Sequence, residues 1–160
     1  MKTIKMEKVL IALDYDSTSQ KVAEIGYSLA KTMKAKVTLL HVIADPLYYN
    51  SEHITVLGFA GGLEASQNQV DELLNLKKIS SSFLDKTKKH LGDKNIKTLI
   101  EEGETAETII KVASDIQADT IVVGSHSHKW LESIILGSVA EKVLHLTKVP
   151  LVIIPTKKAD

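Results

Sequence analysis

Short apolar runs alternate along the chain with longer segments in which apolar residues recur every three or four positions. Continuous apolar runs of this length are typical of strands that are buried on both faces of a parallel sheet. We therefore predict five strands, with a helix between each one and the next. The runs are Val9–Leu13, Val37–Ile43, Ile96–Ile100, Thr120–Val123 and Leu151–Ile154.

Helical spacing fills the intervals, in predicted helices that begin near Ser17, Ser66, Thr105 and Ser138. The first carries an apolar stripe, as expected for a helix with one buried face. Strands that alternate with helices predict one doubly wound α/β domain over residues 1–160, with helices on both faces of a parallel sheet. The members of the stripe are Val22, Ile25, Gly26, Leu29, Ala30 and Met33.

Three short patterns predict how the helices begin. Ser17 and Gln20 have the spacing of a capping box, in which the hydroxyl accepts from a backbone N–H and the amide side chain returns to the cap. Ser138 and Glu141 repeat this spacing, and Thr105 is a third candidate cap. His41 lies inside an apolar run, so we expect it to be a hydrogen-bonded residue of the core.

The segment Ala44–Ala65 has no clear period and is long for a connection in a compact domain. It contains Tyr48, Tyr49 and Phe59. Two interpretations have equal weight: these rings cover a ligand or meet a second copy, or the segment is a loop packed on the surface.

The composition narrows the function. The 160 residues include 20 Lys and Arg against 20 Asp and Glu, so the formal net charge is zero. That balance argues against a protein that coats nucleic acid or an anionic membrane. The absence of cysteine excludes a disulfide scaffold, a thiol nucleophile and Cys-based metal sites, and it fits a reducing cytoplasm. The run Val9–Leu13 is shorter than the roughly 7–15 residues of a signal peptide, so we expect no export signal and no membrane span.

Two segments stand where ligands bind in open α/β sheets, beyond the carboxyl ends of strands at the point where the strand order reverses. Asp14–Asp16 follows the first strand. Gly124–Ser127 follows the fourth, and after nine residues comes Gly137–Ser138. A glycine after a strand admits a ligand close to the backbone, and a helix N-terminus favours an anion. The pattern favours a phosphate site, and its plain alternative is a tight turn followed by an ordinary helix cap.

Several other chemistries are not indicated. The chain has no Gly-x4-Gly-Lys-Ser/Thr loop, no Gly-x-Gly-x-x-Gly after its first strand and no Gly-x-Ser-x-Gly elbow. His126 and His128 lack a third ligand at a recognisable spacing, so we predict no metal site there. No general base stands evidently beside a nucleophile, so the sequence does not indicate a fast enzyme.

These features resemble the universal stress protein family, specifically its ATP-binding branch, whose signature is Gly-x-x-Gly, nine residues, then Gly-Ser or Gly-Thr. The resemblance runs along the whole chain, through KVLIALDYD, LLHVI, ADTIVVGSHS, ILGSVAEKVL and VPLVIIP. It implies a five-stranded sheet in the order 3-2-1-4-5. That order would put Asp14 and Gly124 on facing sides of the crevice between the first and fourth strands.

The resemblance also implies roles for individual residues. Asp14 matches the family's aspartate near adenine and ribose, Val42 the residue that packs on adenine, and Val123 the residue that lines the ribose. Gly124 and the start of the last helix match residues that contact phosphates. The implied nucleotide-binding set is Leu13, Asp14, Val42, Val123, Gly124, Ser127, Gly137, Ser138 and Val139.

Ser127 departs from the signature, which has a second glycine at this position. If the site needs a positive φ or an approach without a Cβ, serine costs roughly 1–3 kcal/mol. That is about one to two decades in Kd. A hydroxyl that donates to a phosphate would offset part of this cost.

The resemblance implies a cytoplasmic, stress-responsive regulator that binds ATP or AMP, with or without Mg²⁺, and is not a fast enzyme. The alternative is a nucleotide-free dimeric adaptor in which Ser127 marks a lost site. Slow ATP hydrolysis or self-phosphorylation is a third, weaker interpretation. The strand Leu151–Ile154 is expected to pair with a second copy, because an apolar sheet edge must be covered. Neither nucleic acid nor a membrane is an expected partner.

Overall fold

The computed structural model of the chain describes residues 4–44, 62–125 and 136–156, and for residues 62–70 it describes the helical backbone alone. Five parallel strands form one sheet in the order β3-β2-β1-β4-β5, which confirms the predicted architecture. The strands are β1 (Lys8–Ala12), β2 (Lys36–Ile43), β3 (Lys97–Glu102), β4 (Thr120–Gly124) and β5 (Leu151–Ile154).

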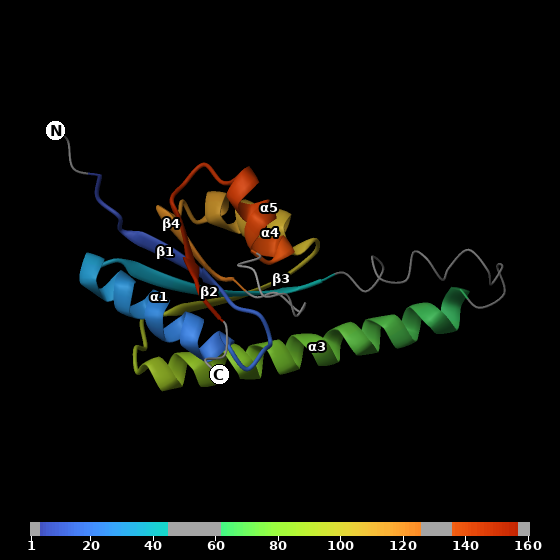
Figure 1. The fold of residues 1–160 in the computed structure, drawn as a ribbon. Helices are drawn as coiled ribbons and strands as arrows, with labels where there is room; N and C mark the ends of the chain where they lie inside the picture. The colour runs from blue at the N-terminus through green and yellow to red at the C-terminus, as the bar shows by residue number, and fades with distance from the viewer. Residues whose placement is uncertain (1–3, 45–61, 126–135, 157–160) are drawn as a thin grey trace.

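Helices cover both faces of this sheet (Figure 1). The helices α1 (Ser19–Met33) and α3 (Gly62–Leu91) cover one face, and α4 (Thr105–Asp115) and α5 (Ser138–Leu146) cover the other. The helix α3 begins four residues earlier than Ser66, the predicted start, and its N-terminal part extends past the sheet. In the described part of the chain, no helix is both long and apolar enough to cross a bilayer.

Alternate side chains of each strand supply two separate cores. Ile11 and Leu39 pack beneath α1 and α3, whereas Leu10 and Leu40 pack beneath α4 and α5. All four are fully buried. Burial on both faces explains why the strands appear in the sequence as continuous apolar runs. Each such side chain contributes about 1.5–3 kcal/mol to folding, before entropy is subtracted.

The helix α1 lies directly against the centre of the sheet at Gly26. A Cβ atom at Gly26 would lie 3.0 Å from Cδ1 of Ile11 and 3.1 Å from Cγ1 of Val122. A side chain there would therefore have to displace β1 and β4 or the helix itself. Small residues consequently face the sheet along this helix, and Ala23 and Ala30 are fully buried beside Gly26.

This close approach corrects part of the predicted stripe of α1. Ile25 is 37% exposed and Leu29 is 39% exposed, although both were predicted to be buried. Ala23, which the predicted stripe leaves out, is fully buried instead. With the helix held so near the sheet, only small side chains fit beneath it, and the larger ones at the flanks extend into solvent.

The predicted capping box at the start of α1 is wrong. The N-cap is Thr18, and its side chain makes no capping hydrogen bond. Asp16 accepts the hydrogen bonds of this turn instead. Its carboxylate accepts from the Thr18 N–H at 2.6 Å, and its carbonyl accepts from the Ser19 hydroxyl at 2.7 Å. A carboxylate two residues before the cap is a stronger acceptor than the hydroxyl of Ser17, so it organises the turn.

The other two predicted caps are each displaced by one residue. Gly137, not Ser138, is the N-cap of α5, so Ser138 is the first helical residue. The cap of α4 is Glu104, not Thr105, and its carboxylate accepts from the Glu107 N–H at 2.8 Å. Lys142 of α5 lies 3.2 Å from the same carboxylate, which links the two helices.

Replacing Gly26 with valine tests the close contact between α1 and the sheet. We expect Gly26→Val to lower the free energy of unfolding by about 2 kcal/mol, because the added atoms overpack the core. Ser28→Val is the matched control, since Ser28 is exposed on the same helix. Denaturant unfolding of both variants measures the difference, and equal effects would show that Gly26 is not a tight contact.

Glu104 gives α4 a pH-dependent cap. Burial opposes its charged form, but the Glu107 N–H and the Lys142 ammonium outweigh burial and lower the pKa of the Glu104 carboxyl. A lowered pKa in the folded state means that the stabilisation is present above the unfolded pKa and disappears as pH falls through the folded value. Glu104→Ala should therefore cost about 1 kcal/mol at neutral pH.

Stability measured from neutral pH down to acid tests this cap. The gap between the wild type and Glu104→Ala should close as the carboxyl becomes protonated. Glu72→Ala, at an exposed position of α3, should show no such convergence. A gap that stays constant down to low pH would mean that the charge of Glu104 does not stabilise α4.

Candidate functional site

The carboxyl ends of β1 and β4 meet where the strand order reverses. Ile11 lies opposite Val122, and continuing this register brings Leu13 level with Gly124. On the other side Ala12 lies opposite Leu40, and the Leu13 N–H extends that ladder by donating to the Leu40 carbonyl at 2.8 Å. A doubly wound sheet binds its ligands at such a point. The crevice between β1 and β4 is therefore the candidate site.

Asp14 follows β1 on the α4–α5 side of the crevice. Ala12 and Val42 both pack against the α4–α5 core, and Asp14 comes two residues after Ala12, level with Val42 in the register of β2. Strand alternation thus puts the Asp14 carboxylate and the Val42 side chain on one side of the sheet. Asp14 is exposed, and one of its carboxylate oxygens accepts from the Tyr15 N–H at 3.0 Å.

His41 fixes the chain just before Asp14. Its Nδ1 lies 2.8 Å from the Leu13 carbonyl oxygen, and because a carbonyl can only accept, Nδ1 carries the proton. The ring is 9% exposed. The prediction of a hydrogen-bonded core histidine is confirmed, and the bond ties β2 to the residue that precedes Asp14.

The start of α5 presents backbone donors at the same edge of the sheet. Gly137 caps the helix in an extended conformation, with φ −61° and ψ 150°. The first hydrogen bond of the helix runs from the Glu141 N–H to the Gly137 carbonyl, at 2.9 Å. The N–H groups of Ser138, Val139 and Ala140 consequently have no carbonyl partner within the helix. Together with the helix dipole, these donors make the N-terminus of α5 a favourable binding position for an anion.

Ser125 joins three elements around the crevice. Its N–H donates to the Ile154 carbonyl at 2.8 Å, and its own carbonyl accepts from the Gly137 N–H at 3.3 Å. Its Oγ accepts from the Thr156 N–H at 3.1 Å. One residue therefore holds the end of β4, the end of β5 and the cap of α5 in a fixed relation. Sequence reasoning missed this role, although Ser125 lies inside the motif; Thr156, which is buried, carried no signal.

The structure brings the described members of the predicted set to one edge of the sheet, but it gives their side chains unequal access. Leu13 and Val123 are each 4% exposed and pack in the cores, so their main chains are what the crevice can use. Val42 and Val139 are half-buried, whereas Asp14 and Ser138 are exposed. The predictions that concern Ser127, His126, His128, Tyr48, Tyr49 and Phe59 lie outside the described residues.

Comparison with known proteins identifies the family. Residues 5–155 match the universal stress protein family. The chain belongs to this family. The universal stress protein MJ0577 of Methanocaldococcus jannaschii is 31% identical over 162 aligned residues, which cover 98% of this chain and 99% of the relative. The solved structure of MJ0577 matches this universal stress protein with a TM-score of 0.73 and 25% identity, and covers 98% of this chain and 100% of its own.

Two further solved structures share the fold at lower identity. A universal stress protein in complex with cAMP matches with a TM-score of 0.62 and 17% identity, over 96% of this chain and 100% of its own. A universal stress protein from Archaeoglobus fulgidus in complex with dAMP matches with a TM-score of 0.56 and 17% identity, over 94% and 99%. At this identity the likeness establishes the fold of this universal stress protein.

Proposed function

We propose that this universal stress protein binds an adenine nucleotide, ATP or AMP, in the crevice between β1 and β4 and acts as a stress-responsive regulator. The observation that carries the proposal is the set of N–H groups at the start of α5 that have no carbonyl partner within the helix. They lie at the carboxyl ends of the strands, where Asp14 and Val42 also lie. The cAMP and dAMP complexes of two proteins with this fold support the choice of ligand. The lack of cysteine supports a cytoplasmic location.

Each part of a nucleotide would find a group of suitable chemistry in the crevice. The half-buried Val42 offers an apolar surface to the base, and the Asp14 carboxylate can accept from a ribose hydroxyl. The N–H groups of Ser138 and Val139 can donate to phosphate oxygens, whose charge the positive end of α5 favours. Mg²⁺ would enter with the phosphates of ATP. The arrangement is suited to binding, and a calorimetric titration with phosphate release followed in parallel separates binding from slow hydrolysis.

Changing the charge at Ser138 tests the phosphate site. Ser138→Asp should weaken the binding of ATP about tenfold or more, because a carboxylate beside the phosphates costs at least about 1.4 kcal/mol. Ser138→Asn is the matched control, because it has the same shape without the charge. Ser138 is exposed and lies in the first helical turn, where aspartate is favourable, so both variants should keep the fold. Isothermal titration of ATP with Mg²⁺, and of AMP, measures the affinities.

The same titration decides between the nucleotide regulator and the adaptor. If Ser127 weakens the site through strain, Ser127→Gly should tighten binding by about one to two decades. A wild type that fails to bind millimolar ATP while Ser127→Gly binds it would favour the nucleotide-free adaptor. Equal affinities for Ser138→Asp and Ser138→Asn would contradict phosphate binding at α5.

We also propose that β5 pairs with β5 of a second copy to form a homodimer. The strand lies at the edge of the sheet. The Pro150 carbonyl accepts from the Ile121 N–H of β4, and the Ile154 carbonyl accepts from the N–H of Ser125, which directly follows β4. In a parallel ladder alternate residues bond to the same neighbour, so the N–H and carbonyl groups of Leu151 and Ile153 are directed away from β4. An edge with free backbone groups and apolar side chains is a ready template for pairing.

Removing one outward donor of β5 tests the dimer. Ile153→Pro deletes the Ile153 N–H and leaves in place the hydrogen bonds that the Pro150 and Ile154 carbonyls accept from Ile121 and Ser125. We expect this variant to be monomeric by sedimentation at concentrations where the wild type is dimeric. Ile153→Ala, which shortens the side chain but keeps the N–H, should remain dimeric. A wild type that is monomeric at all concentrations tested, or an Ile153→Pro variant that stays dimeric, would rule out pairing through β5.

A further inference from the structure

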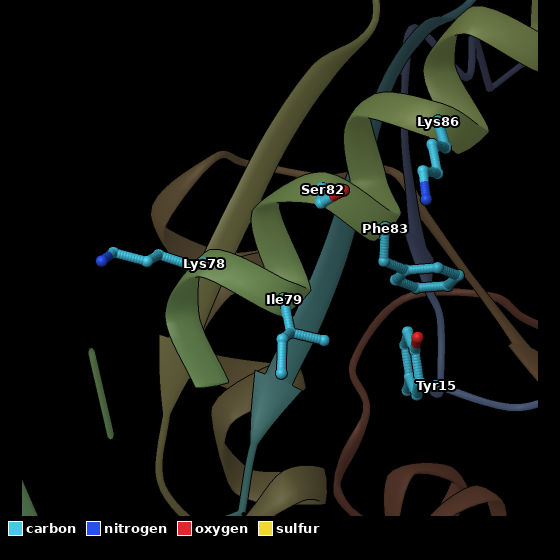
Figure 2. A pocket seen from close by; sticks show the side chains of 6 residues that line it. All are labelled: Tyr15, Lys78, Ile79, Ser82, Phe83 and Lys86. Carbon is cyan, nitrogen blue, oxygen red and sulfur yellow. The ribbon is translucent and has the colours of Figure 1, made fainter. Parts of the chain in front are cut away.

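A hollow lies beside the loop that connects β1 and α1, and the residues predicted to bind a nucleotide do not line it. Its volume is about 360 Å³. An adjoining hollow of about 340 Å³ shares Tyr15 and Phe83 with it and extends to Asp16 and Ser17. Figure 2 shows the lining side chains, which come from α3 and from this loop: Tyr15, Lys78, Ile79, Ser82, Phe83 and Lys86.

The hollow is on the opposite face of the sheet from the crevice. Phe83 packs against the α1–α3 core, whereas Val42 packs against the α4–α5 core. Asp14 and Tyr15 are consecutive, and consecutive side chains at the end of a strand point to opposite faces. The two residues therefore serve two different surfaces, and we call the second one the α3 groove, after the helix that forms its wall.

The floor of the α3 groove is built from aromatic rings. The Tyr15 ring meets the edge of Phe83 with centroids 5.2 Å apart and an interplanar angle of 79°. Phe83 in turn meets the buried His41 ring at 5.9 Å and 77°. Edge-to-face pairs of this kind are worth about 0.5–1.5 kcal/mol beyond their buried area. Tyr15 is therefore held in place although it is 65% exposed, and the groove does not have to form on binding.

Two lysines stand at the ends of the groove. Lys78, Ser82 and Lys86 follow one another at four-residue steps, so the two lysines start about 12 Å apart along the axis of α3. In Figure 2, Ile79 and Phe83 lie between them, Lys86 reaches down beside Phe83, and Lys78 extends from the opposite end. Among the ion pairs of the described residues, neither lysine has a partner, whereas the neighbouring Lys77 pairs with Glu102.

We propose that the α3 groove binds an extended segment of a partner protein with the pattern acid-x-apolar-x-acid. In an extended chain the first, third and fifth side chains point to one face, and the outer two are about 13 Å apart. That spacing matches the separation of Lys78 and Lys86. The central apolar side chain would then lie against Ile79 and Tyr15, which are 41% and 65% exposed.

The spacing of the charges favours a peptide over a nucleotide or inorganic phosphate. In Figure 2 the two lysine side chains extend to different sides and do not converge on one point, as they would around a single phosphate group. The exposed apolar surface between the lysines makes no favourable contact with a phosphate. An apolar side chain that is buried there contributes about 25 cal/mol of binding free energy for each Å² removed from water.

A defined peptide tests the proposal on the full chain. Fluorescence anisotropy follows a labelled peptide Ser-Glu-Ser-Phe-Ser-Glu-Ser, with Ser-Ser-Phe-Glu-Glu-Ser-Ser as the control of equal composition and wrong spacing. We expect the first peptide to bind the wild type more tightly than the second. Lys78→Glu combined with Lys86→Glu should weaken the first peptide about tenfold or more. Lys94→Glu combined with Lys148→Glu changes the net charge equally near the amino ends of the strands, and should leave binding within about twofold.

A second pair of variants tests the apolar centre of the groove. Ile79→Gln should weaken the correctly spaced peptide about fivefold, because the lost contact is worth about 1 kcal/mol. Leu74→Gln is the matched control, since Leu74 is 51% exposed on the same helix and does not line the groove. Both positions are exposed, and glutamine is a good helix former, so the fold should persist, which thermal unfolding verifies.

Three results would overturn the proposal. The first is a wild type that binds neither peptide, and the second is one that binds both equally. The third is a loss of AMP binding in the double variant Lys78→Glu, Lys86→Glu that is as large as its loss of peptide binding, because the groove would then be a phosphate site. Loss of AMP binding in Ser138→Asp, with peptide binding unchanged, would separate the nucleotide crevice from the α3 groove.

Discussion

The strand β1 is the constraint on which the rest of the molecule depends. It pairs with β2 on one edge and with β4 on the other, and its side chains are buried alternately in both cores. A strand enclosed on four sides has no freedom to slip, because a shift of one residue would exchange the two apolar sets. Leu13, at the end of β1, is also held by hydrogen bonds to the Leu40 carbonyl and the His41 ring, and both candidate surfaces are built around that end.

The turn after β1 contributes one residue to each of two surfaces that differ in their chemistry. Asp14 belongs to the crevice with Val42 and the start of α5, where carboxylate, apolar side chain and backbone donors suit a nucleotide. Tyr15 belongs to the α3 groove, where an aromatic floor lies between two lysines. His41 serves both, because its hydrogen bond holds Leu13 while its ring supports Phe83. Two adjacent residues and one buried ring thus support both proposed surfaces, one for a nucleotide and one for a partner protein.

The far side of the crevice is tied to the edge of the sheet. Ser125 bonds to Ile154 at the end of β5, to Thr156 just beyond it, and to Gly137 at the cap of α5. The proposed phosphate donors and the proposed dimer strand are consequently connected through one residue that neither function uses directly.

Sequence alone determined the strands and their parallel arrangement, because burial on both faces leaves continuous apolar runs that need no knowledge of the partner residues. It also located the candidate segments that follow the strands, whose role in binding stays a prediction. The sequence did not predict features that depend on contacts between residues brought together by the fold. Asp16 and Glu104 accept the hydrogen bonds that were predicted for Ser17 and Thr105, because a nearby carboxylate is a stronger acceptor than a hydroxyl. Ile25 and Leu29 are exposed because α1 lies so close to the sheet at Gly26 that larger side chains do not fit beneath it. The α3 groove had no sequence signal, because Tyr15 and Phe83 are far apart in the chain. Only the packing of α3 beside the β1–α1 loop brought them together, and periodicity within one helix cannot reveal which loop lies next to it.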